Sequence, residues 1–205
     1  MLNSQHCELF DIPFFQFSQM KKFCSDEIPL IKAKYKTHWE TWKALNLAVS
    51  RQLGQPFAPP HIEKWCNGWQ VRAHFFAYYK YEFYQNSAAI LSVILNRRRL
   101  SVSLDWHCYR ESRSQINLSQ YNQWLDKLDW QRDADFDLWA GAESEYSDFR
   151  SVKIWQADEL IPSKKSDFWC IGRNVEKADL ANINAVNFIA NTISELVPFY
   201  EACHQ

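Results

Sequence analysis

The sequence is poor in glycine, with four glycines among 205 residues. Loops that cradle phosphate groups are built from closely spaced glycines, and these four stand far apart along the chain. The patterns G-x-x-x-x-G-K-[ST], G-x-G-x-x-G, G-x-S-x-G and H-E-x-x-H are all missing. These absences argue against P-loop NTPases, dinucleotide-binding enzymes, hydrolases of the nucleophile-elbow type and H-E-x-x-H metalloproteases.

Long apolar runs and clustered cysteines are missing as well. No stretch of about eighteen apolar residues is present, and the N-terminus lacks the basic and apolar segments of a secretory signal. The six cysteines are scattered without a C-x-x-C pair, as expected for reduced thiols. We therefore expect a cytoplasmic protein that does not enter the membrane.

Metal-binding patterns are incomplete. The acidic segment DADFDLWAGAES, residues 133–144, resembles a calcium loop, but Leu138 stands where glycine is required and Ser144 where glutamate is required. The histidines and cysteines do not have the spacing of a known metal site. We expect no metal and no other cofactor.

What the sequence does have is a large apolar content. Hydrophobic residues make up 47% of the chain and include ten tryptophans, enough for a substantial core in one domain spanning residues 1–205. The net charge is −1, but residues 1–113 carry 15 Lys/Arg against 9 Asp/Glu, and the remaining residues carry 8 against 15. The basic first half favours an anionic ligand, unless the two halves are neighbours that neutralise each other.

Three segments have the spacing of apolar residues that is typical of helices. The first covers residues 18–54, where Pro29 should break the segment into two helices and Gly54 stands where a helix ends. The second and third cover residues 117–130 and 182–202. The chain is therefore expected to begin and end with helices.

Alternation of apolar and polar residues predicts a three-strand antiparallel meander over about residues 71–110. The expected fold class is α+β, with this sheet packed by the N- and C-terminal helices. The meander strands are expected at 71–84, 88–95 and 99–110, and weaker strands at 136–142, 149–155 and 167–173.

The apolar residues also predict a register. A short turn between the second and third strands sets Leu91 opposite Leu104 and keeps the apolar residues on one face. A three-residue loop between the first and second strands sets Tyr79 opposite Val93. Loops one residue shorter or longer would turn charged side chains into the core.

This register gathers polar side chains on the other face of the sheet. Asp105 and His107 share that face, and Glu82 falls in the same cross-strand row as Asp105. A carboxylate beside an imidazole can orient it and raise its pKa, as general-base catalysis requires. The candidate catalytic residues are therefore His107, Asp105 and Glu82, and the alternative is an ordinary solvated face. The same rows add three candidate ligand-binding residues, Lys80, Tyr84 and Ser103.

Arginines flank the third strand at both ends. Arg97 and Arg99 stand at its start, and Arg110 and Arg113 follow it, so that either group could meet phosphates. With Tyr109 as a stacking surface, the pattern is similar to that of RNA-binding sheets. The net charge near zero argues against nucleic acid, and a charged turn also keeps a hairpin tip soluble. We expect a small anionic ligand, with Arg97, Arg99 and Tyr109 among its contacts.

The run KYEFYQNSAAILSVILNRRRLSVSLDWHCYRES resembles a small family of uncharacterised bacterial proteins of about this length, some of which carry the label glucose-6-phosphate 1-dehydrogenase. The residues do not support that label. The true dehydrogenases are far longer, bind NADP at a glycine-rich turn and carry adjacent Asp and His in an I-D-H-Y-L-G-K-E run. Here Trp106 separates Asp105 from His107, and Arg110 stands near the place of the lysine.

Two classes of function remain. The first is a binding or regulatory domain that holds a small or anionic ligand at the polar face of the sheet. The second is a small hydrolase-like or lyase-like enzyme in which His107 is the general base and Asp105 or Glu82 orients it. The first is preferred because no nucleophile, metal or cofactor motif accompanies this pair.

Overall fold

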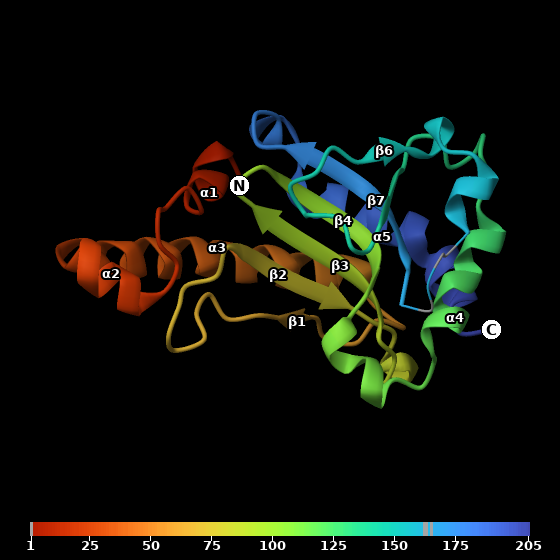
Figure 1. Ribbon diagram of the computed structural model, residues 1–205, viewed down its shortest axis with the longest axis horizontal. Helices are drawn as coiled ribbons and strands as arrows, with labels where there is room; N and C mark the ends of the chain where they lie inside the picture. Colours follow the sequence, from red (N-terminus) through yellow and green to blue (C-terminus); the bar gives the residue numbers. More distant parts are fainter. Residues whose placement is uncertain (1, 162–163, 165) are drawn as a thin grey trace.

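The computed structural model describes residues 2–161, 164 and 166–205 of the chain. Its centre is a seven-stranded sheet in the order β1-β2-β3-β4-β7-β5-β6, in which each strand runs antiparallel to its neighbours. One strand departs from chain order, because β7 lies between β4 and β5 (Figure 1). The strands are β1 His61–Ile62, β2 His74–Tyr79, β3 Ala89–Asn96, β4 Arg99–Trp106, β5 Asp137–Ala140, β6 Arg150–Ser151 and β7 Trp169–Glu176.

Two long helices, α3 and α5, lie on the same face of the sheet (Figure 1). The C-terminal helix α5 packs against β3, β4 and β7, while α3 contacts β2 and α5. The α+β fold class expected from the sequence is therefore confirmed, with an antiparallel sheet packed by N- and C-terminal helices. The helices are α1 Ser4–Glu8, α2 Phe17–Phe23, α3 Ile28–Leu53, α4 Leu118–Tyr121 and α5 Ala185–Ala202.

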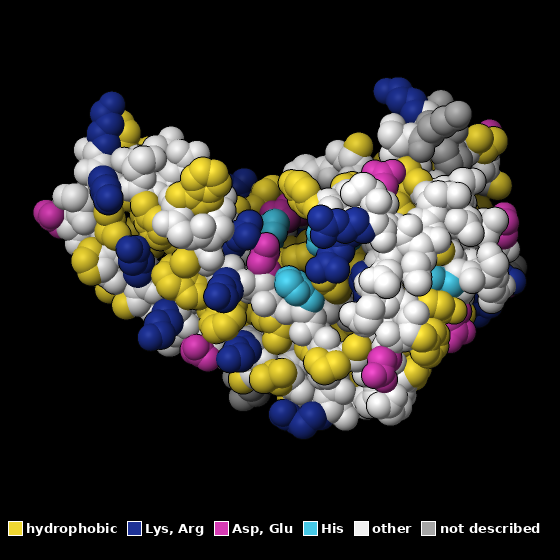
Figure 2. Space-filling view, turned by 90° about the horizontal axis from the view of Figure 1, so that it is seen from below, with side chains coloured by type: hydrophobic (Ala, Val, Ile, Leu, Met, Phe, Trp, Pro, Cys, Tyr) yellow, Lys and Arg dark blue, Asp and Glu magenta, His cyan; other side chains and the backbone are white. Residues whose placement is uncertain are grey.

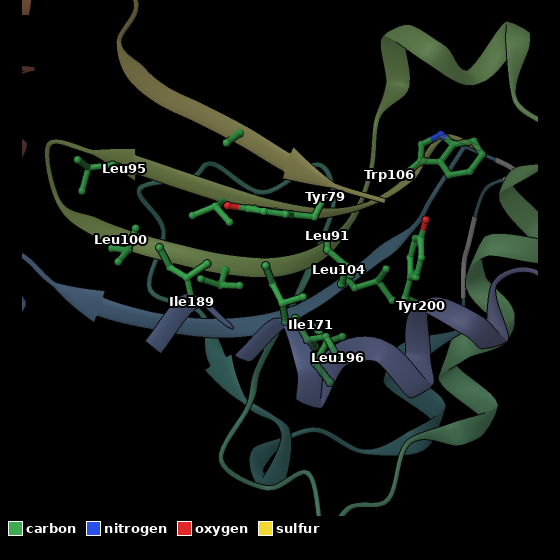
Figure 3. Packing of buried hydrophobic residues seen from close by; sticks show 14 of the residues in the cluster. Tyr79, Leu91, Leu95, Leu100, Leu104, Trp106, Ile171, Ile189, Leu196 and Tyr200 are labelled. Carbon is green, nitrogen blue, oxygen red and sulfur yellow. The ribbon is translucent and has the colours of Figure 1, made fainter. Parts of the chain in front are cut away.

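The hydrophobic core fills the space between the sheet and these helices. Leu91 of β3 and Leu104 of β4 are fully buried and point toward Ile189 and Leu196 of α5 (Figure 3). Fully burying one such side chain stabilises the folded state by about 1.5–3 kcal/mol. Alternate residues of each strand supply this face, and the residues between them form the opposite face that carries the candidate site.

The predicted break at Pro29 is confirmed. Helix α2 ends at Phe23, and α3 begins at Ile28 with Pro29 in its first turn, where a missing backbone N–H breaks no helical hydrogen bond. Helix α3 ends at Leu53, and the next residue, Gly54, has a φ of 62° in the left-handed region that favours glycine. The proline and the glycine in the sequence therefore predicted where the longest helix begins and ends.

The predicted pairing of the second and third meander strands is also confirmed. Leu91 lies opposite Leu104, and Val93 lies opposite Val102. The other apolar residues of this hairpin are also paired as predicted. Both strands are buried along their length, so a slip of one residue would bury the wrong side chains.

The predicted pairing of the first and second strands is wrong by two residues. Tyr79 lies opposite Leu91 instead of Val93, because β2 ends at Tyr79 and the chain leaves the sheet. The ring of Tyr81 turns into the core against Tyr200, and a 3-10 helix covers Glu82–Tyr84. A shift of two residues preserves the face of every side chain, so the error moves positions along the strand but not across it.

The remaining elements agree with the expected ranges more loosely. The range 117–130 contains α4 and a 3-10 helix, Asn122–Lys127, and the three weaker strands appear as β5, β6 and β7. Within the described part of the chain, no helix has the length and apolar character needed to cross a membrane. That residues 1–205 form one domain stays a prediction.

Candidate functional site

The sheet face away from α3 and α5 carries the predicted site and is called here the polar face. It presents Ser92 of β3, Ser103 of β4 and Asp105 of β4, together with the aromatic rings of Phe76 and Tyr78 from β2. Ser92 and Ser103 are 1% and 3% exposed, and their hydroxyl oxygens lie 3.4 Å apart. The middle of the polar face is therefore buried at these two serines and is not an ordinary solvated sheet surface there.

One end of the polar face is held closed by Arg99. Its guanidinium is 3% exposed and donates to the carbonyl oxygens of Glu145, at 2.9 Å, and Ser147, at 2.5 Å. It also lies 4.2 Å above the ring of Phe149 and 3.6 Å from a carboxylate oxygen of Glu176. These contacts hold the segment between β5 and β6 against the sheet.

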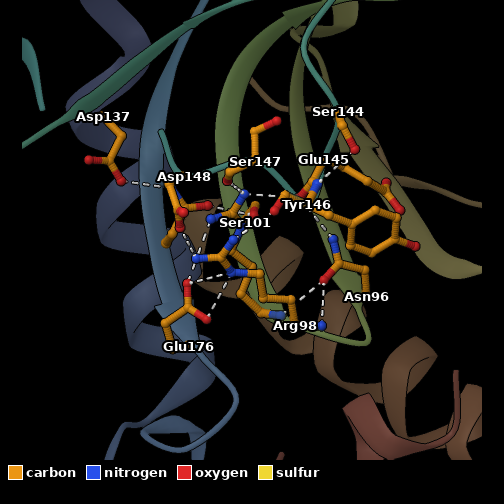
Figure 4. A network of polar contacts seen from close by, with 12 residues as sticks. Asn96, Arg98, Ser101, Asp137, Ser144, Glu145, Tyr146, Ser147, Asp148 and Glu176 are labelled. Atoms are coloured by element: carbon orange, nitrogen blue, oxygen red, sulfur yellow. Dashed lines mark hydrogen bonds and ion pairs between the residues drawn. The ribbon is translucent and has the colours of Figure 1, made fainter. Parts of the chain in front are cut away.

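The two preceding arginines, Arg97 and Arg98, also contact the segment between β5 and β6. Arg98 binds Asp148 and Glu176 and donates to the Tyr146 carbonyl oxygen at 2.6 Å (Figure 4). Arg97 lies over the ring of Tyr146, 4.7 Å from its centre. Arg97 and Arg99, expected as ligand contacts, thus contact the chain's own loop; one terminal nitrogen of Arg99 makes both hydrogen bonds there, while its Nε has no partner among the described residues.

Asp105 lies farther along the polar face, beside β7. Its carboxylate accepts the backbone N–H of Trp106 at 2.7 Å and the thiol of Cys170 at 3.4 Å. Burial raises the pKa of the Asp105 carboxyl above its ordinary value. Among the described residues, no hydrogen bond joins Asp105 to His107, so the structure does not assemble the predicted carboxylate–imidazole pair.

His107 follows the end of β4 and lies among aromatic rings. Its ring meets that of Tyr78 edge to face at 5.6 Å, and His61 stacks on the same tyrosine at 4.7 Å. Burial lowers the pKa of both imidazoles, and the positive charge of Arg110 lowers each pKa further. Both histidines are therefore neutral at pH 7 and gain a charge in acid.

A lysine and an arginine complete this cluster around Tyr78. The Lys80 ammonium lies 5.5 Å, and the Arg110 guanidinium 5.7 Å, from the centre of its ring. Lys80 is 3% exposed and donates to the backbone carbonyl oxygens of Gln85 and Ser87. Burial, and then Arg110, lowers the pKa of Lys80 to about 8. Among the described residues, neither cation forms an ion pair with a carboxylate.

A pocket of about 580 Å³ opens beside this cluster. Three of its lining side chains are cationic or can become so: His107, Arg110 and Arg113. The lining contains no aspartate or glutamate. In the space-filling view, histidine, arginine and lysine side chains lie around the hollowed middle of the molecule, with acidic side chains among them (Figure 2). The other lining residues are Gln85, Asn86, Ser87, Tyr109 and Ser112.

The remaining predicted site residues are dispersed. Glu82 is exposed on the 3-10 helix after β2, so the predicted row that joined it to Asp105 does not form. Tyr84 stacks on His204 with ring centres 3.7 Å apart. Tyr109 is 96% exposed at the edge of the pocket, 6.1 Å from the His107 ring.

Three residues near the pocket, His61, Ser87 and His204, were not expected there. His61 belongs to a two-residue strand that is too short for a periodic signal. Ser87 and His204 are 117 residues apart in sequence and meet only because α5 returns to the loop before β3. The described residues contain no group of three or more histidine, cysteine, aspartate or glutamate side chains that could hold a metal ion.

Comparison with known proteins places the chain among relatives of the same length. A protein-family model matches residues 2–203. A protein of Haemophilus influenzae, named "Uncharacterized protein", is 63% identical over 204 residues, which cover 100% of this chain and 99% of that relative. Neither match supports the dehydrogenase label.

Proposed function

Because the chain belongs to a small family of uncharacterised bacterial proteins, we propose a function from the site itself: a binding or regulatory domain that holds a small anionic ligand. The pocket beside Tyr78 is the proposed site. The observation that carries this proposal is its lining, which places Arg110, Arg113 and His107 around one space without a carboxylate. An anion entering that space would meet charge-assisted donors that no acidic side chain of the lining competes for.

The surroundings strengthen the attraction for an anion. Lys80 lies beneath the pocket wall, because its ammonium donates to the carbonyl oxygens of Gln85 and Ser87. Its positive charge adds to that of the lining. Tyr109 stands exposed at the rim, where its ring can cover a bound group. Both features agree with a compact anion held at the pocket and shielded in part from water.

The alternative function, an enzyme with His107 as general base, has less support. A general base needs a partner that orients its ring, and neither Asp105 nor Glu82 provides one. His107 instead contacts the rings of Phe76 and Tyr78. We retain a cytoplasmic location and a single domain as proposals; the six free cysteines support the first.

Sulfate and inorganic phosphate should bind this pocket and raise the unfolding temperature. Replacing Arg110 or Arg113 by glutamine should weaken binding by about 10–100-fold, since a hydrogen bond to a charged group contributes about 1.5–3 kcal/mol. Isothermal titration calorimetry measures the affinity directly. Arg51→Gln, on the exposed last turn of α3, is the matched control and should bind as the wild type does. Equal affinity in all four proteins would contradict the proposed site.

Binding of sulfate should tighten as the pH falls below about 6.5. His107 is neutral at pH 7 because burial and Arg110 lower its pKa, so acid adds a positive charge to the pocket. Sulfate remains a dianion throughout this range, which leaves the protein as the source of the change. The pH dependence should flatten in His107→Gln but persist in His38→Gln, whose ring lines a different cavity. An unchanged pH profile in His107→Gln would contradict a role for this histidine.

A further inference from the structure

A serine and a histidine form a hydrogen-bonded pair at the wall of the proposed anion pocket. The Ser87 hydroxyl oxygen lies 2.9 Å from Nε2 of His204, and Nδ1 of the same ring lies 2.8 Å from the carbonyl oxygen of Tyr200. Ser87 precedes β3, and His204 follows α5, the last helix. The binding function proposed above makes no use of this pair.

The carbonyl oxygen determines which nitrogen of His204 carries the proton. A carbonyl can only accept, so Nδ1 must donate to Tyr200, and the neutral ring then has Nε2 free to accept. The Ser87 hydroxyl therefore donates to Nε2. This is the order of a nucleophile, a base and a group that orients the base, with a backbone carbonyl in the third position.

Packing holds the imidazole in this position and keeps it neutral. The ring of His204 stacks on that of Tyr84 at 3.7 Å with an angle of 3° between the planes. Burial lowers the pKa of His204, and the charge of Lys80 acts in the same direction. A neutral, fixed imidazole is the form that can take a proton from a serine.

Ser87 also lines the pocket that holds Arg110 and Arg113. The serine is 1% exposed, so its hydroxyl is almost fully covered, and a group that reaches it must be small and must displace part of the pocket wall. An anionic group on the same molecule would lie against the arginines. The pocket therefore suits a substrate in which a small acyl group is joined through oxygen to an anion.

We propose that Ser87 and His204 form a nucleophile–base pair that hydrolyses small acyl phosphates or anionic acyl esters. The Ser87 oxygen bonds to the acyl carbon while its proton passes to Nε2 of His204. The bond between the acyl carbon and the leaving oxygen then breaks, and the leaving anion takes that proton. Water then bonds to the acyl carbon and gives a proton to Nε2. The bond between the acyl carbon and the Ser87 oxygen breaks, and that oxygen takes the proton from Nε2, which releases the acid and restores both residues. This inference rests on the proposed anion pocket and adds bond cleavage to it.

The sequence around Ser87, Asn-Ser-Ala, has no glycines and lies on a loop before a strand. It therefore differs from the nucleophile elbow, in which a serine between glycines joins a strand to a helix. Arrangements of this kind arise on unrelated folds and are recognised by geometry and role. The assignment of Ser87 and His204 as a nucleophile and a base rests on their hydrogen bond and on that between His204 and Tyr200, and not on a sequence motif.

Acetyl phosphate is the test substrate, with release of inorganic phosphate and acetylation of Ser87 as the two readouts. Wild-type protein should release phosphate above the buffer rate, and Ser87→Ala should lose at least 100-fold of that rate. His204→Phe, which keeps a ring against Tyr84 but removes the base, should show a similar loss. Peptide mapping by mass spectrometry should find the acetyl group on Ser87.

Ser18→Ala is the control, because Ser18 is an exposed serine on α2 that does not line the pocket. It should hydrolyse acetyl phosphate at the wild-type rate. Sulfate affinity should stay unchanged in Ser87→Ala, which separates loss of chemistry from loss of the anion pocket and also reports correct folding. Absence of turnover in the wild type, or equal rates in wild type and Ser87→Ala, would overturn this proposal while leaving anion binding intact.

Discussion

Replacing Arg99 by alanine is expected to lower the free energy of unfolding by about 3 kcal/mol or more. The change removes the two hydrogen bonds that the buried guanidinium donates to the carbonyl oxygens of Glu145 and Ser147. Each bond to a charged group contributes about 1.5–3 kcal/mol, and the stacking on Phe149 adds to this. Urea unfolding followed by tryptophan fluorescence measures the loss.

Arg97→Ala provides the comparison for this variant. Arg97 is exposed and lies over the ring of Tyr146, so its loss should cost about 0.5–1 kcal/mol. Hydrogen exchange should also increase in the segment between β5 and β6 of Arg99→Ala and stay unchanged in Arg97→Ala. Equal stability of the two variants would show that Arg99 does not hold this segment on the polar face.

Replacing Gly172 by alanine is expected to destabilise the protein by about 3 kcal/mol, at the upper end of the usual cost of overpacking. Gly172 lies in β7 opposite Ser103 of β4 and opposite Asp137 of β5. A methyl group there would overlap the backbone carbonyl oxygen of Val102 and come within 2.7 Å of the Ser103 side chain. Both neighbours are fixed by strand pairing, so the sheet itself must move. Thermal and urea unfolding report the effect.

Gly141→Ala tests the same idea with a movable neighbour. A methyl group at Gly141 would overlap the ring of Phe168, which is half-buried and can turn aside. We therefore expect a loss below about 1.5 kcal/mol, clearly smaller than at Gly172. A larger loss at Gly141 would mean that the ring is held more firmly than the paired backbone of β4.

Local patterns account for the parts of the fold that the sequence predicted well. The pairing of Leu91 with Leu104 follows from a short turn and unbroken alternation, which together leave one register. The pairing of β2 failed because alternation repeats every two residues and cannot detect a slip of two. What ended β2 at Tyr79 was the burial of Tyr81 against α5, a contact between segments far apart in sequence.

Contacts between segments far apart in sequence also explain which parts of the candidate site were predicted and which were not. Sequence reasoning placed His107 and Lys80 on one side of the sheet, and both lie around Tyr78. It also treated Arg99 as free to bind a ligand, because nothing local indicates that the segment between β5 and β6 covers it. Ser87 and His204 carry no shared motif, and their contact depends on where the last helix ends.

The position of β7 determines when the sheet can be completed during synthesis. Strands β5 and β6 leave the ribosome before β7, yet β7 is the strand that joins them to β4. Until β7 has emerged, β4 is an open edge, and α5, which covers the core, is made later still. The nascent chain thus exposes both an unpaired strand and an uncovered apolar face, which are the surfaces that chaperones recognise and that aggregation exploits.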